Sequence, residues 1–218
     1  MEPNRTTLLN HLVIKHNLKR YLEIGVQNPD QNFNKILCEY KVSVDPDPNA
    51  HATFCMDSDQ FFSANNPIDY IDVTTKDSAP LHQTLERDKR FSLIFIDGLH
   101  TAEQVKKDFE NALKFLSPNG FIVLHDCNPL KEEHTIVPRP TERGHWNGDV
   151  YKFAAALLHK KKFTVDIDNG CMVCPGNREK YQILYEPLST WTWDLFDKNR
   201  HSINLISWDE FISANPHI

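Results

Sequence analysis

Carboxylate, imidazole and amide side chains follow two strongly apolar segments of the sequence. Both segments have the length of a strand, and the residues that follow them can bind ions or move protons. These residues are Asp97, His100, His125, Asp126 and Asn128. Two carboxylates beside an imidazole can bind a divalent cation or deprotonate a hydroxyl, so this pattern indicates a functional site.

The two apolar segments are expected to be neighbouring strands of one sheet. They span residues 92–96 and 121–124, and one helix-length segment separates them. Residues 101–104 have the pattern of a capping box at a helix start, and residues 118–120 are typical of a helix end. This order favours a parallel pair, and ligands bind at the carboxyl ends of parallel strands. We therefore expect the polar residues to meet at one mouth.

The rest of the chain shows alternating strand and helix patterns. Apolar periodicity indicates a helix at residues 6–17, and Asn169-Gly170 indicates a hairpin. Further strands are expected at residues 21–25, 40–45, 52–56, 163–168 and 171–173. Further helices are expected at residues 33–38 and 150–159 and near residues 81–88.

These elements predict a single doubly wound, Rossmann-like α/β domain that spans residues 1–218. Its sheet should be mostly parallel, with a C-terminal antiparallel hairpin and helices on both faces. Within it, we expect an N-terminal helix in residues 1–19 and a helical segment in residues 188–218. Residues 129–147 are a long loop rich in proline and charge, which we interpret as an active-site lid.

Composition excludes several classes of protein. The 218 residues carry a net charge of −6, so a nucleic-acid partner is not expected. No apolar run is long enough to predict a membrane span, and the N-terminus does not resemble a signal peptide. The five cysteines are scattered, which argues against a disulfide framework and favours the cytoplasm. The oligomeric state stays open, and a homo-oligomer is one of the alternatives.

Glycine and acidic residues follow the earlier strands as well. Glu23-Ile-Gly25 ends the first strand, where glycine permits a close approach of the backbone to a ligand. Asp45 ends the second strand about twenty residues later, a position at which an acid commonly binds a ribose. A turn aspartate before proline explains Asp45 equally well, so the motif is weak on its own.

The order of these motifs resembles class I S-adenosylmethionine-dependent methyltransferases, in the branch of the small-molecule and sugar O-methyltransferases of the macrocin type. Further residues in the resemblance are Asp57-Ser58-Asp59 and Trp146-Asn-Gly-Asp149. The resemblance implies S-adenosyl-L-methionine as cofactor. It implies contacts from Glu23, Gly25, Val26, Asp45, Ser58, Asp59 and Asp97. The chain departs from the family at Asn28-Pro29, where a second glycine is usual.

The resemblance to catechol-type enzymes implies a Mg²⁺ ion, or another divalent cation, at the mouth of the sheet. Asp97 and Asp126 match the two acidic ligands of those enzymes. Cys127 occupies the position of the adjacent amide, and Asn128 follows one residue later as the third candidate ligand. The alternative is a hydrogen-bonded pair of acids that shapes the cleft without a metal.

His100 is the candidate general base, together with Asp97 as a catalytic residue. In catechol-type enzymes a lysine holds the position of His100, and imidazole has a suitable pKa for the same task. The alternative is a histidine that only caps the following helix. His125 precedes Asp126 on a strand, so alternation directs it to the opposite face and predicts a structural role.

The predicted lid carries the candidate acceptor-binding residues, which are Arg139, Arg143, His145 and Trp146. Solvated loop residues are the alternative. The resemblance implies methyl transfer to a hydroxyl of a small molecule or sugar, in a biosynthetic pathway. Two other functions stay open. One is a nucleotide-sugar glycosyltransferase that uses Asp45 and Asp47, and the other is a non-catalytic cofactor-binding module.

Overall fold

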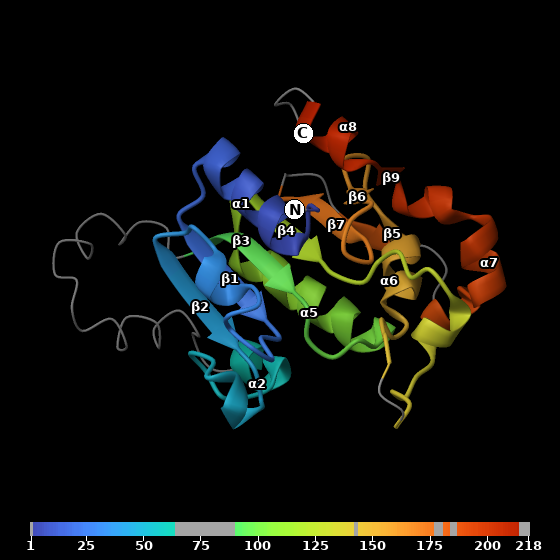
Figure 1. The fold of residues 1–218 in the computed structure, drawn as a ribbon, viewed down its shortest axis with the longest axis horizontal. Coiled ribbons are helices and arrows are strands. Elements are labelled where there is room, and N and C mark those ends of the chain that lie inside the picture. The colour runs from blue at the N-terminus through green and yellow to red at the C-terminus, as the bar shows by residue number, and fades with distance from the viewer. Residues whose placement is uncertain (1, 64–89, 142–143, 177–180, 184–186, 214–218) are drawn as a thin grey trace, which may run out of the picture.

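The computed structural model describes residues 2–63, 90–141, 144–176, 181–183 and 187–213. These residues form a seven-stranded sheet with helices on both faces, and a separate two-stranded sheet (Figure 1). The predicted helix near residues 81–88 lies outside the described residues. In the part of the chain that the structure describes, no helix is both long enough and apolar enough to cross a membrane.

The main sheet has the order β2-β1-β3-β4-β7-β6-β9. Its strands are β1 (Arg20–Ile24), β2 (Tyr40–Val44), β3 (Phe91–Ile96), β4 (Leu116–Leu124), β6 (Phe163–Val165), β7 (Cys171–Pro175) and β9 (Leu205–Ile206). β2, β1, β3 and β4 are parallel, and β7 is antiparallel to both β4 and β6. The second sheet pairs β5 (Leu157–Leu158) with β8 (Gln182–Ile183). The Rossmann-like prediction with a C-terminal antiparallel hairpin is confirmed.

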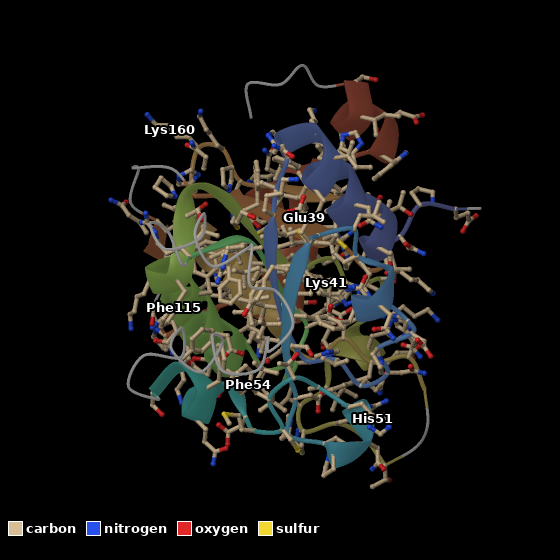
Figure 2. The ribbon with its side chains drawn as sticks, turned by 90° about the vertical axis from the view of Figure 1, so that its left-hand side faces the viewer. Glu39, Lys41, His51, Phe54, Phe115 and Lys160 are labelled. Atoms are coloured by element: carbon tan, nitrogen blue, oxygen red, sulfur yellow. The ribbon has the colours of Figure 1, made fainter. Side chains whose placement is uncertain are left out.

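The α-helices are α1 (Arg5–His16), α2 (Ser58–Ser63), α5 (Ala102–Phe115), α6 (Val150–Ala156), α7 (Trp193–Lys198) and α8 (Trp208–Ser213). Short 3₁₀ helices are η1 (Phe33–Lys35), η2 (Pro48–Ala50), η3 (Glu132–Thr135), η4 (Leu188–Thr190) and η5 (Arg200–Ile203). α7 and α8 lie on the side of the molecule away from β2 (Figure 1). Figure 2 views the molecule from the β2 side, where Lys41 and Phe54 are labelled.

Two apolar clusters cover the two faces of the sheet, because strand residues alternate between them. Leu22 and Ile94 pack with residues of α5 and α6 in one cluster. Tyr21 and Leu93 pack with residues of α1 and α8 in the other. The sheet is therefore buried on both sides, as expected of parallel strands with near-continuous apolar sequences.

Several predicted elements are shorter than expected. Residues 33–38 form only the single turn η1, and the chain is extended again at Ile36. Residues 52–56 contribute one bridge, from Phe54 to Val44, and α6 ends at Ala156. The predicted capping box is half formed: Thr101 accepts from the Gln104 backbone N–H, whereas the Gln104 side chain contacts Ser58 on α2.

Candidate active site

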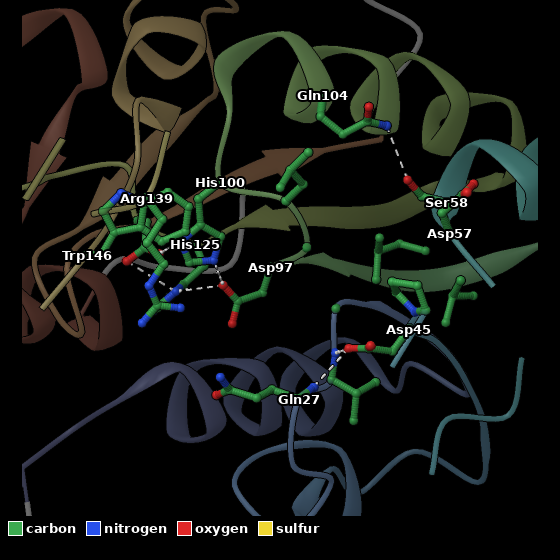
Figure 3. A pocket seen from close by; sticks show the side chains of 18 of the residues that line it. Gln27, Asp45, Asp57, Ser58, Asp97, His100, Gln104, His125, Arg139 and Trp146 are labelled. Carbon is green, nitrogen blue, oxygen red and sulfur yellow. Dashed lines mark hydrogen bonds and ion pairs between the residues drawn. The ribbon is translucent and has the colours of Figure 1, made fainter. Parts of the chain in front are cut away.

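A cavity of about 680 Å³ lies at the carboxyl ends of β1, β2, β3 and β4 (Figure 3). This is the edge at which open α/β sheets bind ligands, and the volume is typical of small-molecule sites. Its lining includes Gly25, Val26, Asp45, Ser58, Asp59, Asp97, His100, Asp126, Arg139 and Trp146. Most residues predicted from the sequence as site residues therefore meet at one cavity.

Gly25 begins the turn after β1 with a φ of 84°, a conformation that favours glycine. Its N–H donates to the carbonyl of Val44, and a Cβ at this position would clash with the backbone carbonyl of Asp97. The close approach that requires glycine is therefore between two strand ends. The turn lines the cavity because β1 and β3 meet here.

Asp45 is buried and holds the Gly25 turn in place. Its Oδ2 accepts hydrogen bonds from the backbone N–H groups of Val26 and Gln27, at 2.8 and 3.0 Å. Its Oδ1 accepts from the N–H of Asp47 at 2.8 Å. Asp45 lines the cavity as predicted, and the structure adds a role in shaping the turn that the sequence did not indicate.

Glu23 is not among the residues that line the cavity. Its carboxylate accepts hydrogen bonds from the Tyr21 hydroxyl at 2.6 Å and from the Asn32 amide at 3.1 Å. Burial raises the pKa of Glu23 to about 7, and the two hydrogen bonds offset only part of that shift. Glu23 thus belongs to a buried polar cluster beside the turn.

Ser58 and Asp59 open helix α2 on the far side of the cavity. The Gln104 amide of α5 donates to Ser58 Oγ at 3.2 Å and to Asp59 Oδ1 at 3.1 Å. Asp57 precedes them, and its Oδ1 accepts from the Gln60 N–H at 2.7 Å, as the predicted helix start requires. These contacts fix two of the predicted cofactor residues against α5.

Asp97, His100 and Asp126 form a close polar group in the cavity. One potential ligand atom from each lies within 4.8 Å of the others. His100 Nε2 is 3.4 Å from Asp97 Oδ1, and His100 Nδ1 is 3.1 Å from Asp126 Oδ2. The two carboxylates and the imidazole therefore converge as the strand pattern predicted.

His125 lies in the same group, so the prediction that it points to the opposite face was wrong. Its Nδ1 is 3.0 Å from Asp97 Oδ1, and it lines the cavity. Asp126 has a φ of 59°, which is left-handed and ends the strand geometry. Strict alternation of side chains therefore stops at this position, and His125 and Asp126 both face the cavity.

Charge and burial have opposite effects on the pKa values of Asp97, His100 and His125. Burial alone would raise the pKa of Asp97, but the His125 charge and hydrogen bonds from both histidines hold it well below its usual range. Burial alone would lower the pKa of His100, but its contacts with Asp97 and Asp126 raise it. The pKa of His125 is raised well above its usual value for the same reason, by Asp97 and Asp126.

Asn147, and not Asn128, supplies the amide beside Asp126. The Asn147 Nδ2 donates to Asp126 Oδ1 at 2.6 Å, and the residue is fully buried. Asn128 instead donates to Asp166 at 3.0 Å and accepts from Arg200 at 2.5 Å. Its amide is thus engaged away from the group of Asp97, His100 and Asp126.

Arg5, the first residue of α1, also reaches the cavity and was not predicted as a site residue. Its Nη1 lies 3.3 Å from Asp168 Oδ2, and its Nε lies 4.0 Å from Asp97 Oδ2. The same Nη1 lies 3.5 Å from His125 Nε2. Arg5 therefore ties the N-terminal helix to the carboxyl ends of β3 and β4. No local pattern in the sequence indicates this contact.

The predicted lid brings two of its four candidate residues to the cavity. Trp146 stacks on His100, with ring centroids 5.0 Å apart and planes inclined by 10°. The Arg139 guanidinium lies 5.1 Å from the centre of the Trp146 ring. His145 contacts Asn169 at 2.8 Å and does not line the cavity itself, and Arg143 lies outside the described residues.

The segment after Trp146 is fastened to the residues that carry His100. The N–H of Asp149 donates to the His100 carbonyl at 3.1 Å, and Asp149 Oδ1 accepts from the Ala102 N–H at 2.7 Å. Gly148 has a φ of 64°, and a Cβ there would clash with the same carbonyl. The motif from Trp146 to Asp149 thus holds the loop after β3.

Residues 29–127 match a family model described as a methyltransferase domain. The match contains β2, β3 and β4, together with Asp45, Asp97 and Asp126. It confirms the resemblance to methyltransferases. A search of the curated proteins found no match to the chain.

Solved methyltransferase structures have a similar architecture. One is the S-adenosylhomocysteine-bound methyltransferase PaMTH1 of Podospora anserina, with 18% identity and a TM-score of 0.47, covering 79% of this chain and 78% of that chain. Another is an O-methyltransferase of Bacillus cereus, also with S-adenosylhomocysteine, with 15% identity, a TM-score of 0.44, and coverage of 80% and 82%.

Proposed function

Residues 29–127 match a methyltransferase-domain model, and on that basis we propose that the chain transfers the methyl group of S-adenosylmethionine to a hydroxyl of a small molecule or sugar. One observation carries the proposal. A single cavity joins the Gly25 turn and Asp45 to the group of Asp97, His100 and Asp126. A cofactor site and a site for proton transfer therefore share one space.

The cofactor fits the end of the cavity formed by the turn after β1. Gly25 and Val26 would lie along its methionine part, and Asp45 would accept from the ribose hydroxyls. Ser58 and Asp59 would border the adenine, and Asp97 the reacting end. Asp45 Oδ1 has a single hydrogen bond within the described chain, so a lone pair stays available for the ribose.

The group of Asp97, His100 and Asp126 also fits a divalent cation such as Mg²⁺. The carboxylates of Asp97 and Asp126 are hard oxygen donors, and each accepts a hydrogen bond that orients it, from His125 and Asn147 respectively. Bound there, the cation would lower the pKa of an acceptor hydroxyl. EDTA should suppress activity and Mg²⁺ restore it, and full activity in excess EDTA would leave both acids as substrate-binding or structural groups.

The chemistry needs little from the protein beyond position and deprotonation. S-adenosylmethionine, when bound, supplies an already activated methyl group. In its neutral form, His100 would accept the proton of the acceptor hydroxyl, and Asp97 would hold the imidazole in place. Trp146 would cover one side of His100 and exclude water from it. Orientation of the two reactants is then the main contribution of the fold.

Residues 129–147 would act as a lid over the acceptor. Trp146 already contacts His100, and its Nε1 donates to the Ile136 carbonyl at 2.7 Å. Cofactor and acceptor together should slow proteolysis of this segment, because a closed lid is less accessible. Equal cleavage with and without ligands would count against a closing lid.

Two rival functions make different predictions. A glycosyltransferase would use Asp45 and Asp47 for a metal, but Asp47 Oδ1 accepts from the Asn49 backbone and side chain, at 2.9 and 2.8 Å. A non-catalytic module would bind cofactor without turnover. The test is incubation with methyl-labelled S-adenosylmethionine and a panel of sugars, polyols and phenols. The proposal predicts labelled ether, and binding without transfer to any hydroxyl would favour the module.

A biosynthetic role and a small-molecule acceptor belong to the same proposal and depend on the sequence resemblance. A cytoplasmic location is proposed because the N-terminal sequence does not resemble a signal peptide. The net charge of −6 supports the absence of a nucleic-acid partner. Measured affinity for RNA or DNA at physiological salt would contradict that part.

A further inference from the structure

The acceptor side of the cavity holds an arginine that forms no ion pair with an acid among the described residues. Arg139 is exposed, lines the cavity, and forms no ion pair with the part of the chain that the structure describes. Arg5, the other arginine in the lining, differs because Asp168 lies 3.3 Å from its guanidinium. Within the described part of the chain, Arg139 is therefore an exposed positive charge that faces the cavity.

Arg139 and His100 share one neighbour, the side chain of Trp146. The centre of the Trp146 ring lies 5.1 Å from the Arg139 guanidinium carbon and 5.0 Å from the His100 ring centre. Trp146 is itself anchored, because its Nε1 donates to the Ile136 carbonyl at 2.7 Å. Arg139 and His100 both contact Trp146 and both line the cavity, so they can contact two parts of the same small molecule.

The charges in the cavity are unevenly distributed. Asp45, Asp57 and Ser58 lie at one end, and Arg139, Trp146 and His100 lie at the other, with Asp97 between them (Figure 3). The acids at the first end suit the ribose hydroxyls of the cofactor, and Asp97, between the two ends, suits its positive sulfonium. The second end also holds Asp126, whose Oδ2 lies 3.1 Å from His100 Nδ1. Arg139 adds a positive charge there, which favours a negatively charged acceptor and would attract it toward the mouth.

We propose that the acceptor is an anionic hydroxyl compound whose carboxylate or phosphate pairs with Arg139 while its hydroxyl lies against His100. The inference depends on the proposed methyl transfer and names the class of acceptor. Leu99 lines the same mouth with 59% of its surface exposed. An acceptor with an apolar or ring-shaped body would cover Leu99 between its two polar groups.

Ligand-observed NMR on protein saturated with S-adenosylhomocysteine tests this inference. One probe set is D-glucose, D-glucuronate and D-glucose 6-phosphate, and a second is catechol and 3,4-dihydroxybenzoate. We expect the charged members to bind roughly 5- to 20-fold more tightly than the neutral one, as for a charge-assisted hydrogen bond at a partly exposed site. The carboxylate and phosphate members show which anion is preferred.

Variants then assign the preference to one side chain. Arg139→Gln should abolish it, and Arg139→Lys should retain part of it, because lysine keeps the charge without the planar stacking on Trp146. Lys160→Gln is the control. It removes the same charge from an exposed residue that does not line the cavity, and it should leave the affinity for every probe unchanged.

Three results would overturn the inference. They are equal affinity of the wild-type protein for charged and neutral probes, an unchanged preference in Arg139→Gln, and failure of every charged probe to bind protein that does bind S-adenosylhomocysteine. Failure of S-adenosylhomocysteine itself to bind is a separate result. It would contradict the methyl-transfer proposal, and the inference with it.

Discussion

The Asn147 amide donates a 2.6 Å hydrogen bond to Asp126, a residue 21 positions earlier in the chain. Asn147 follows Trp146, which stacks on His100, so one short segment orients both an acid and an imidazole of the site. A buried hydrogen bond to a side chain that binds a metal or substrate orients that side chain and alters its affinity. The role of Asn147 is therefore to position Asp126.

Asn147→Ala should lower turnover roughly 10- to 100-fold and weaken divalent-cation binding, because Asp126 loses the donor that orients it. Cofactor affinity should stay close to that of the wild type. Steady-state kinetics and a Mn²⁺ titration measure these effects. Asn128→Ala is the comparison: it should lower the melting temperature, since Arg200 and Asp166 lose their partner, and leave Mn²⁺ affinity intact. The opposite pattern would restore Asn128 as the ligand.

His100→Ala should lower turnover by roughly 10²- to 10⁴-fold, the usual contribution of a positioned base. Cofactor affinity should be nearly unchanged, because the imidazole acts on the acceptor. Turnover across pH and Mn²⁺ affinity are measured in the same variant. Surviving turnover with the wild-type pH profile would mean that the proton leaves by another route. A collapse of Mn²⁺ affinity would instead make His100 a ligand.

Asp45→Ala should weaken cofactor binding by about 2–4 kcal/mol, since the ribose loses a charged acceptor. The backbone N–H groups of Val26 and Gln27 also lose their acceptor, so the variant should unfold at a lower denaturant concentration. Calorimetry and urea unfolding separate the two effects. Asp45→Asn keeps a hydrogen-bond acceptor for the turn. Compared with Asp45→Ala, it should recover more of the resistance to urea than of the affinity for the cofactor. Unchanged affinity in both variants would remove Asp45 from the cofactor site.

Glu23 should make the protein less stable as the pH rises. Its folded pKa is raised to about 7 from 4.5, so the neutral acid is favoured in the folded state. The contribution of the Glu23 carboxyl group to the free energy of unfolding is therefore complete below pH 4.5 and is lost progressively up to about pH 7. Glu23→Gln removes this loss, and urea unfolding should find it more stable than wild type at pH 8, by at most about 3 kcal/mol.

Near pH 4.5 the Glu23→Gln variant and the wild type should differ little in unfolding free energy, because both side chains are then neutral. Glu39→Gln is the control, because Glu39 forms an exposed ion pair with Lys19. The difference in unfolding free energy between this variant and the wild type should not increase between pH 4.5 and pH 8. A constant difference between Glu23→Gln and wild type from pH 4.5 to 8 would mean that Glu23 stays ionised in the folded protein.

The sequence predicted the parallel sheet and its ligand-binding edge because local patterns determine both. Apolar strands that end in Asp45, Asp97 and Asp126 are visible without any long-range information. The prediction that His125 points to the opposite face was wrong for a local reason. Asp126 adopts a left-handed conformation, so the alternation of side chains between the two faces of the sheet does not continue there. The prediction of a helix at residues 33–38 was wrong, because only the turn η1 forms there and the chain is extended again at Ile36.

Arg5 and Asn147 could not be assigned from local patterns. Arg5 reaches the site only because α1 packs across the sheet and brings its first residue to Asp97 and Asp168. Asn147 lies within a motif that the family resemblance included, but its contact with Asp126 depends on how the segment folds back over the loop after β3. Contacts between distant segments, and not residue types, decide these two roles.

The central claim is that the cavity between the Gly25 turn and Asp126 binds S-adenosylmethionine. Isothermal titration of the wild-type protein with S-adenosylhomocysteine, the demethylated product, tests it most directly. We predict one site per chain with a dissociation constant on the order of micromolar, typical of a small polar ligand held by a few charged hydrogen bonds. UDP-glucose with Mn²⁺ should give no binding heat. Heat with UDP-glucose and none with S-adenosylhomocysteine would contradict the claim.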